Sequence, residues 1–293
     1  MTDPIVPVQT SQWSEAQALP QYVEAVEAGQ VLYFPRLRFT LSESESKLLR
    51  PDVRDPAKRN ISQAPGTRVV GAVGSTAEID TLDAMMLRFR NQATQLVDSL
   101  FPMYHGHLAP QPTSFRPSEV ESRAQSWRAD DKRLHVDSFP SRPNRGMRIL
   151  RVFTNLNPNG VPRVWRVGEP FEAMARHFMP RIKRYSPLQA AMLNKLHVTK
   201  SLRSEYDHMM LQLHDLMKSD MDYQRNAEQT EFGFPPGSSW VCFSDQTLHA
   251  VHSGQFMMEQ TYFMQPQHQA RPERSPLGIL TRMKGRALEG APL

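Results

Sequence analysis

Leu134-His135-Val136-Asp137-Ser138 is the stretch of sequence from which a fold and a site can be argued together. His135 and Asp137 are two residues apart, so on a β-strand their side chains point to the same face. An imidazole and a carboxylate placed in this way can bind one metal ion from the same side. A metal site would still need a third ligand from a distant part of the chain.

The downstream stretch at residues 245–252, Asp-Gln-Thr-Leu-His-Ala-Val-His, offers two candidates for that third ligand. His249 and His252 have opposite parity on a strand, so only one of them is expected to face the metal. We favour His249, because it follows an apolar strand and a turn, whereas His252 directly precedes the turn residues Ser253 and Gly254. Replacing each histidine by alanine would distinguish the two.

Two histidines and one carboxylate form a facial triad, which leaves open positions on the metal and is typical of non-haem Fe(II) oxygenases. The simpler interpretation is that the His-x-Asp pair arises by chance and that Asp137 only caps His135. The surrounding sequence favours the metal site, because a loop rich in proline and arginine and then a strong strand follow the pair. The sequence therefore predicts an Fe(II) site.

The composition is that of a soluble globular protein with a modest excess of basic residues. The 293 residues carry a formal net charge of +5. This charge favours an anionic partner: a nucleic acid, a phosphorylated or carboxylated substrate, or a membrane surface. The sequence shows neither an apolar run long enough to cross a membrane nor a signal peptide. Because Cys242 is the single cysteine, no internal disulfide is expected. We therefore expect a cytoplasmic protein.

Short apolar segments bounded by turn residues predict several strands around the motif. They lie at residues 31–34, 147–156, 161–167, 239–244 and 256–264. Strands and helices do not alternate along the chain, which argues against a parallel sheet. The expected fold class is mainly β with added helices, built on a double-sheet antiparallel barrel.

Helical patterns occupy separate parts of the chain. Ser75 and Glu78 form a capping box before an apolar stripe that runs to Leu100 and predicts a helix packed on the outside of a sheet. Residues 169–220 have helical periodicity and predict an insertion within the β domain, and residues 266–293 predict an irregular tail. We expect residues 1–293 to form a single domain, with residues 42–68 and 138–146 as candidate lids.

Longer segments of the sequence resemble the bacterial hydroxylases of 3-deoxy-D-manno-oct-2-ulosonic acid (Kdo). The resemblance covers most of the chain and is carried by residues 58–62, 114–117, 134–158 and 236–256. It implies a dioxygenase domain with a double-stranded β-helix core of the jelly-roll, cupin-like type. It also implies an Fe(II)/2-oxoglutarate-dependent dioxygenase in which His135, Asp137 and His249 bind the iron.

The resemblance implies a cosubstrate site as well. Most enzymes of this superfamily bind the far carboxylate of 2-oxoglutarate with a basic residue about ten positions after the distal histidine, but residues 256–261 contain none. A second arrangement places the cation on the strand after the motif, where Arg151 stands. Arg116 is expected as a second cation, and Trp165 as an apolar wall or an indole donor. The reaction would consume O2, with ascorbate supporting it in vitro, and would need no catalytic side chain beyond the metal centre.

The implied reaction is hydroxylation of C3 of a Kdo sugar in the lipopolysaccharide inner core, on a Kdo-bearing lipid A precursor. Arg142, Arg145 and Lys132 flank the motif and are candidates for binding this acidic sugar. Such a substrate would place the protein in the cytoplasm, in peripheral contact with the inner face of the inner membrane. No nucleic-acid partner is expected, because basic residues do not form a stripe interleaved with aromatic ones.

Two other functions are compatible with the same residues. The first is a cupin-type metalloenzyme that does not use 2-oxoglutarate, which would have no need of Arg151. The second is a non-enzymatic jelly-roll module that binds an acidic saccharide, whose ligand binding would be indifferent to iron.

Overall fold

A computed structural model describes residues 3–120 and 126–289. Its larger sheet has eight strands in the order β1-β2-β9-β6-β11-β5-β3, and β4 pairs with β11 outside this path. The strands are β1 (Ile5–Pro7), β2 (Val31–Phe34), β3 (Ile61–Gln63), β4 (Ala109–Pro110), β5 (Thr113–Arg116), β6 (Arg148–Asn155), β9 (Ser239–Phe243) and β11 (Met257–Met264).

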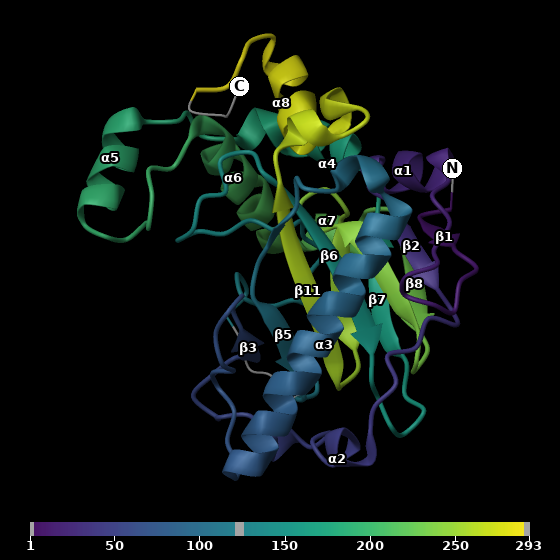
Figure 1. Ribbon diagram of the computed structural model, residues 1–293. Coiled ribbons are helices and arrows are strands. Elements are labelled where there is room, and N and C mark those ends of the chain that lie inside the picture. The colour runs from purple at the N-terminus through teal and green to yellow at the C-terminus, as the bar shows by residue number, and fades with distance from the viewer. Residues whose placement is uncertain (1–2, 121–125, 290–293) are drawn as a thin grey trace.

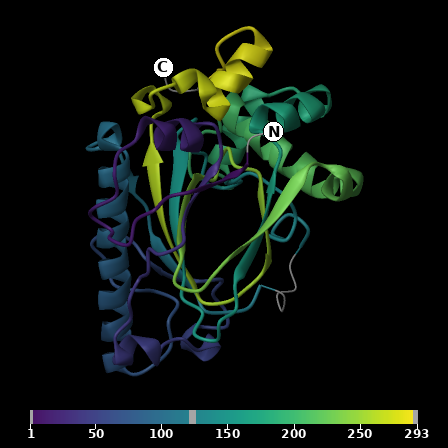
Figure 2. The same ribbon diagram turned by 90° about the vertical axis from the view of Figure 1, so that its right-hand side faces the viewer.

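A smaller sheet of three antiparallel strands faces the larger one (Figure 2). Its order is β10-β7-β8, formed by β10 (His249–Ser253), β7 (Arg163–Gly168) and β8 (Gln229–Phe234). The described strands form two open sheets rather than a closed barrel. The expected fold class, mainly β with a jelly-roll core and added helices, is confirmed by this architecture and by the structural relatives given below.

The long strands of the larger sheet divide their side chains between two environments. β6 and β11 pair over eight residues, from Met257 opposite Asn155 to Met264 opposite Arg148. Because side chains alternate along a strand, Leu150 and Val152 face the outer apolar core while Arg151 and Phe153 face the smaller sheet. The pairing register therefore fixes which polar side chains enter the space between the sheets.

Helix α3 (Thr76–Leu100) packs on the outer face of the larger sheet, as the sequence predicts (Figure 1). Ser75 and Glu78 form the expected capping box, in which each side chain bonds the backbone of the other. The helix buries its apolar stripe in the outer core, which it shares with apolar side chains of β6, β9 and β11. Each fully buried large apolar side chain contributes about 1.5–3 kcal/mol, so this stripe is a major part of the core.

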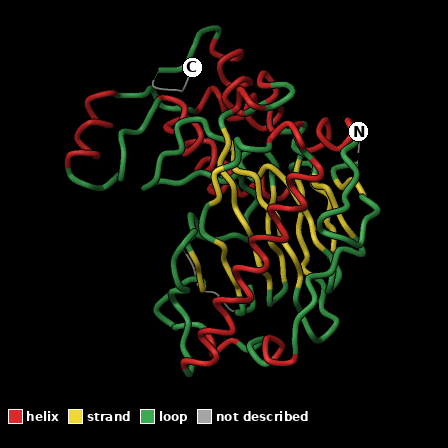
Figure 3. Tube along the Cα trace, viewed as in Figure 1, coloured by secondary structure: helices red, strands yellow, loops and turns green. Residues whose placement is uncertain are grey.

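The other helices gather mainly at one end of the sheets (Figure 3). Four of them follow β7 and precede β8 along the chain, namely α4 (Phe171–Phe178), α5 (Pro187–Lys195), α6 (Glu205–Ser219) and α7 (Met221–Asn226). The helical block thus extends beyond the expected boundary at residue 220. Further helices are α1 (Pro20–Glu27), α2 (Glu43–Ser46), η1 (Pro51–Val53), η2 (Pro102–Tyr104) and η3 (Met179–Arg181). Within the described residues no helix is long and apolar enough to cross a membrane.

The expectation of an irregular tail at residues 266–293 is wrong for its described part. The segment contains η4 (Pro266–His268), η5 (Pro272–Arg274) and the helix α8 (Pro276–Lys284). Ser275 caps α8, and Gly285 ends it in the left-handed conformation. Ile279 and Leu280 bury it against the helical cluster that contains α4 and α6. Pro276 and Gly285 stand at the two ends of α8, so the prolines and glycines of this segment bound a short helix and do not exclude one.

Candidate metal centre and cosubstrate pocket

The metal centre, which we define as His135, Asp137 and His249, comes together between the two sheets. One potential ligand atom from each residue lies within 4.8 Å of the others. His135 and His249 form a backbone bridge with two hydrogen bonds of 2.9 Å, and the Asp137 amide donates to the carbonyl of Ser244 at 2.8 Å. These backbone bonds fix the motif against β10 and the turn before it.

The local sequence explains why the polar side chains of the motif face inward together. Leu134 and Val136 alternate with His135 and Asp137, and both apolar side chains are fully buried in the helical cluster. Their burial turns the intervening side chains to the opposite face. His252 is exposed, whereas His249 is buried beside His135 with ring centroids 4.5 Å apart. The structure thus brings His249, and not His252, to the metal centre.

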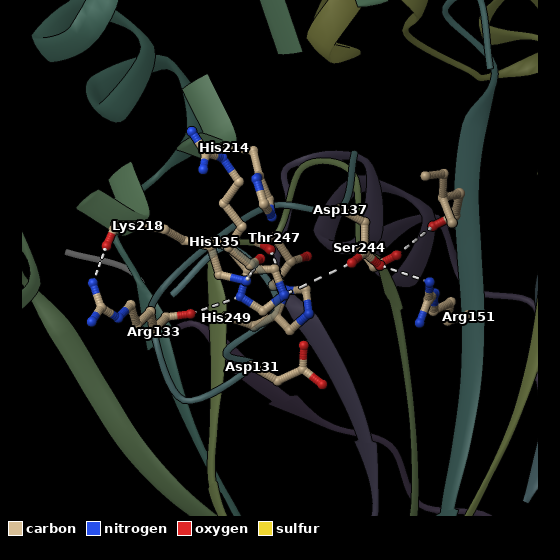
Figure 4. A network of polar contacts seen from close by, with 12 residues as sticks. Asp131, Arg133, His135, Asp137, Arg151, His214, Lys218, Ser244, Thr247 and His249 are labelled. Atoms are coloured by element: carbon tan, nitrogen blue, oxygen red, sulfur yellow. Dashed lines mark hydrogen bonds and ion pairs between the residues drawn. The ribbon is translucent and has the colours of Figure 1, made fainter. Parts of the chain in front are cut away.

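Backbone carbonyls determine the proton positions on both histidines. The Nδ1 atom of His135 lies 2.7 Å from the carbonyl oxygen of Arg133, and that of His249 lies 2.9 Å from the carbonyl oxygen of Thr247 (Figure 4). A carbonyl only accepts, so Nδ1 donates in each ring and a neutral ring leaves the Nε2 lone pair free for a metal. Burial lowers the pKa of His135 and of His249, which favours this neutral form.

Asp137 is held as a carboxylate by a neighbouring cation. The guanidinium of Arg151 lies 3.0 Å from the Asp137 carboxylate. Burial alone would raise the pKa of Asp137, but the charge of Arg151, helped by a hydrogen bond from Ser244, outweighs burial and holds it well below its usual range. Two neutral imidazoles and one carboxylate suit Fe(II), so the donor set fits the metal that the sequence predicts.

The three ligands open into a cavity of about 580 Å³ that also contains Arg116, Arg151 and Trp165. Trp165 stacks on the ring of His249 with centroids 5.0 Å apart. Among the described residues, neither the indole Nε1 of Trp165 nor the Nε of Arg151 has a hydrogen-bond partner. Unpaired buried donors are costly, so two of them in one cavity fit an anionic ligand such as the carboxylate of 2-oxoglutarate.

Glu259 is a residue of this pocket that the sequence reasoning missed. Its carboxylate lies 3.0 Å from the guanidinium of Arg116 and 3.4 Å from that of Arg151, and the side chain is almost fully buried. Burial raises the pKa of Glu259, but the two arginines outweigh burial and lower it. Glu259 stands ten positions after His249, where the superfamily comparison expects a cation. The feature of the sequence that could have indicated this role is that Glu259 is an isolated acid within a mostly apolar strand.

The three cations expected to bind the sugar do not line this cavity. Arg142 and Arg145 are exposed, and Lys132 is half-buried outside it. The reason is tertiary: the backbone amide of Arg145 donates to Asp207 on α6 at 2.8 Å, which holds this part of the loop against the helix. The cations that line the outer part of the cavity are instead Arg59, Arg128 and Lys218.

Two facing open sheets, antiparallel except for the β1–β2 pair, with a His-Asp-His centre and a cationic pocket define the class of non-haem Fe(II)/2-oxoglutarate-dependent dioxygenases. The family model described as 3-deoxy-D-manno-oct-2-ulosonic acid (Kdo) hydroxylase matches residues 9–287, and the chain belongs to this family. No curated protein gives a significant match.

Solved structures of the Kdo hydroxylase KdoO, a non-haem Fe(II) alpha-ketoglutarate-dependent dioxygenase, match nearly the whole chain. The complex with alpha-ketoglutarate and Fe(III) is 41% identical, with 98% of both chains covered and a TM-score of 0.93. The cobalt(II) complex is 41% identical, with 99% of both chains covered and a TM-score of 0.95. The complex with succinate and Fe(III) is 40% identical, with 99% coverage and a TM-score of 0.94. These matches confirm the predicted family, enzyme class and cofactors.

Proposed function

We propose that the chain hydroxylates C3 of a Kdo sugar on a lipid A precursor of lipopolysaccharide, using Fe(II), 2-oxoglutarate and O2. The observation that carries the proposal is a set of two imidazoles and one carboxylate in a cavity that Arg151 and Trp165 also line. In the balanced reaction one oxygen atom of O2 enters the sugar. The other enters succinate as 2-oxoglutarate loses CO2.

One set of side chains would bind the metal, and a second set would bind and orient 2-oxoglutarate. His135, Asp137 and His249 would hold Fe(II), whose chemistry when bound is the activation of O2 coupled to decarboxylation of 2-oxoglutarate. Arg151 would bind the far carboxylate of 2-oxoglutarate, with Trp165 as a further donor. Arg116 would act with Arg151, because both share Glu259. No side-chain acid or base is required.

The outer cations would receive the acidic sugar. Lys218 is fully buried at the cavity, where its Nζ donates to the carbonyl of Arg128 at 2.9 Å and burial lowers its pKa. Arg59 and Arg128 are partly exposed and pair with Asp131 and Asp215. A sugar carboxylate could replace these acids as the partner of either arginine. We propose Arg59, Arg128 and Lys218 as the substrate-binding cations in place of the three expected from the sequence.

Lipid A carries acyl chains, so this acceptor would lie in a bilayer. The proposal therefore includes a cytoplasmic protein that contacts the inner face of the inner membrane. The cationic lining of the cavity supports an acceptor with carboxylates and phosphates. Neither alternative function accounts equally well for Arg151, which lines the same cavity as the metal centre and pairs with its carboxylate ligand Asp137.

The test is succinate formation by purified protein with Fe(II), 2-oxoglutarate and ascorbate, with and without Kdo-bearing lipid A, alongside His135→Ala. We expect succinate to rise with the acceptor, the acceptor to gain one oxygen atom, and the variant to show neither. Succinate without acceptor dependence would retain the oxygenase and reject the substrate. Iron binding without succinate would favour the cupin-type enzyme, and iron-independent saccharide binding would favour the non-enzymatic module.

A further inference from the structure

Residues 183–203, which we name the α5 arm, expose an unusual number of large apolar side chains. Eleven such side chains are exposed in the described part of the chain, and five of them lie in this short segment. They are Leu188, Met192, Leu196, Val198 and Leu202, with exposures between 50% and 85%. Scattered exposed apolar residues are normal, but a cluster of this kind marks an interaction surface.

The cluster has a helical geometry. Leu188, Met192 and Leu196 are spaced by four residues, so they lie on one face of α5 and its C-cap. The opposite side buries Ala190. Figure 1 shows α5 standing away from the sheets at one side of the molecule, next to α6. A helix that is apolar on most of its surface is normally buried, so the free face of α5 calls for a partner.

The charge of the arm indicates which partner. The sequence contains no Asp or Glu between Glu172 and Glu205, and the arm carries five Lys and Arg residues. Of these, Lys183, Arg184, Lys195 and Lys200 are exposed. Apolar side chains framed by cations fit the surface of an anionic bilayer, which takes both into its interfacial region. Two copies of the arm would instead bring like charges together, which disfavours self-association through this face.

The arm is also joined to the rim of the cavity. The amide of Lys200 donates to the carbonyl of Ser141 at 2.9 Å, and the guanidinium of Arg203 donates to the carbonyl of Pro140 at 2.7 Å. Pro140 lines the cavity that contains the metal centre. A surface bound by the arm would therefore lie near the entrance to the site.

We propose that the α5 arm is a membrane-docking surface that inserts Leu188, Met192 and Leu196 into the interface of an anionic lipid bilayer. The arm thereby holds the rim of the cavity at the bilayer. Its binding to lipid is independent of the reaction, whereas its value for catalysis rests on the proposed function with a lipid-linked acceptor.

The first test is sedimentation with vesicles of phosphatidylcholine, with and without phosphatidylglycerol, in the absence of any Kdo lipid. We expect binding to the anionic vesicles, and at least a tenfold loss of partitioning in Leu188→Ser/Met192→Ser/Leu196→Ser, because each buried apolar side chain contributes strongly. Lys195→Glu/Lys200→Glu should also lose about tenfold or more, and added salt should weaken the wild type. The matched control Val70→Ser/Val73→Ser/Leu87→Ser removes exposed apolar residues elsewhere and should bind as the wild type does.

Equal vesicle binding by the wild type and the arm variants would overturn the proposal, as would no binding by the wild type. Sedimentation velocity without lipid tests the competing partner: dissociation of a wild-type dimer by the arm variants would make the arm an interface between copies.

Turnover of a Kdo-lipid acceptor in detergent micelles separates this proposal from the proposed function. Arm variants that turn over micellar acceptor normally and vesicle acceptor poorly would support it, and an equal loss in both would contradict it. If the wild type binds vesicles but turns over neither acceptor, the substrate assignment fails and the docking surface stands.

Discussion

The two ends of the cavity are built in different ways. The inner end is supplied mostly by paired strands, which place Arg151 and Glu259 by register and leave their paired side chains only 12% and 6% exposed. The outer end is supplied by loops and by α6, and its arginines are partly exposed and paired with single acids. Strands hold side chains closely enough for metal and cosubstrate binding, whereas loops and helices suit a large, variable acceptor. The difference indicates where substitutions should abolish chemistry and where they should only weaken binding.

The largest effect is expected at the metal centre. Asp137→Asn removes the one anionic ligand, so metal affinity should fall by more than about 100-fold, since even groups that only support metal ligands cost about 10–100-fold. Turnover of 2-oxoglutarate should fall at least as far. Titration calorimetry with cobalt(II) measures the affinity. Asp131→Asn is the matched control, because Asp131 lines the same cavity but lies outside the triad. If both variants bound cobalt(II) as the wild type does, the assigned ligand set would be wrong.

The next largest effect is expected at Arg151. Arg151→Met leaves a buried carboxylate ligand without its cation and removes the fork for 2-oxoglutarate, so the KM for 2-oxoglutarate should rise by roughly 30-fold or more, since truncating one partner of a buried charge pair costs about 2–5 kcal/mol. Steady-state kinetics at saturating acceptor measure this rise. Arg151→Lys keeps the charge but loses the fork. Its KM for 2-oxoglutarate should therefore lie between that of the wild type and that of Arg151→Met. An unchanged KM for 2-oxoglutarate in folded Arg151→Met would assign its carboxylate to another residue.

A smaller effect is expected at Glu259, which connects Arg116 and Arg151. Glu259→Gln keeps the size of the side chain but removes the charge that both guanidiniums share. The KM for 2-oxoglutarate should change by on the order of tenfold, since a hydrogen bond to a charged group is worth about 1.5–3 kcal/mol. If Glu259→Asp has the wild-type KM for 2-oxoglutarate, binding of 2-oxoglutarate requires a negative charge at this position. A uniform loss of thermal stability with unchanged kinetics would make Glu259 purely structural.

The smallest effect is expected at the outer end. Arg128 is 62% exposed in its side chain and pairs with Asp215, and exposed pairs are worth about 0.2–1 kcal/mol. Arg128→Ala should raise the KM for the Kdo acceptor by no more than about fivefold and leave the KM for 2-oxoglutarate unchanged. Kinetics with each substrate varied in turn separate these effects. A change in the KM for 2-oxoglutarate equal to that of Arg151→Met would remove the distinction between the two ends.

The sequence predicted the inner end better than the outer one, for a physical reason. His135 and Asp137 follow strand alternation, a local rule that a sequence displays directly, and Arg151 was expected from the family resemblance because it lies on the strand after the motif. The capping box and apolar stripe likewise predicted α3. The direction of a loop depends on contacts such as Arg145 to Asp207, which connect distant segments and leave no periodic pattern.

Short elements and long-range pairing account for the remaining errors. α8 is too short to show a helical period in the sequence. The role of Glu259 depends on the pairing of β11 with β5 and β6, which brings Arg116 and Arg151 beside it. Residues 256–261 contain no cation, and nothing in their local pattern marks Glu259 as the partner of Arg116 and Arg151 on neighbouring strands. Residues that act through long-range pairing are therefore the ones that a sequence pattern alone conceals.

The central claim, that the metal centre transfers oxygen from O2 to a Kdo sugar, is tested most directly with oxygen-18. Kdo-bearing lipid A is incubated with the protein, Fe(II) and 2-oxoglutarate under labelled O2, and the acceptor and succinate are examined by mass spectrometry. We predict one labelled oxygen atom at C3 of the sugar and one in succinate, and neither product with His135→Ala. Labelled succinate with an unmodified acceptor, or an acceptor that gains only unlabelled oxygen, would contradict the claim.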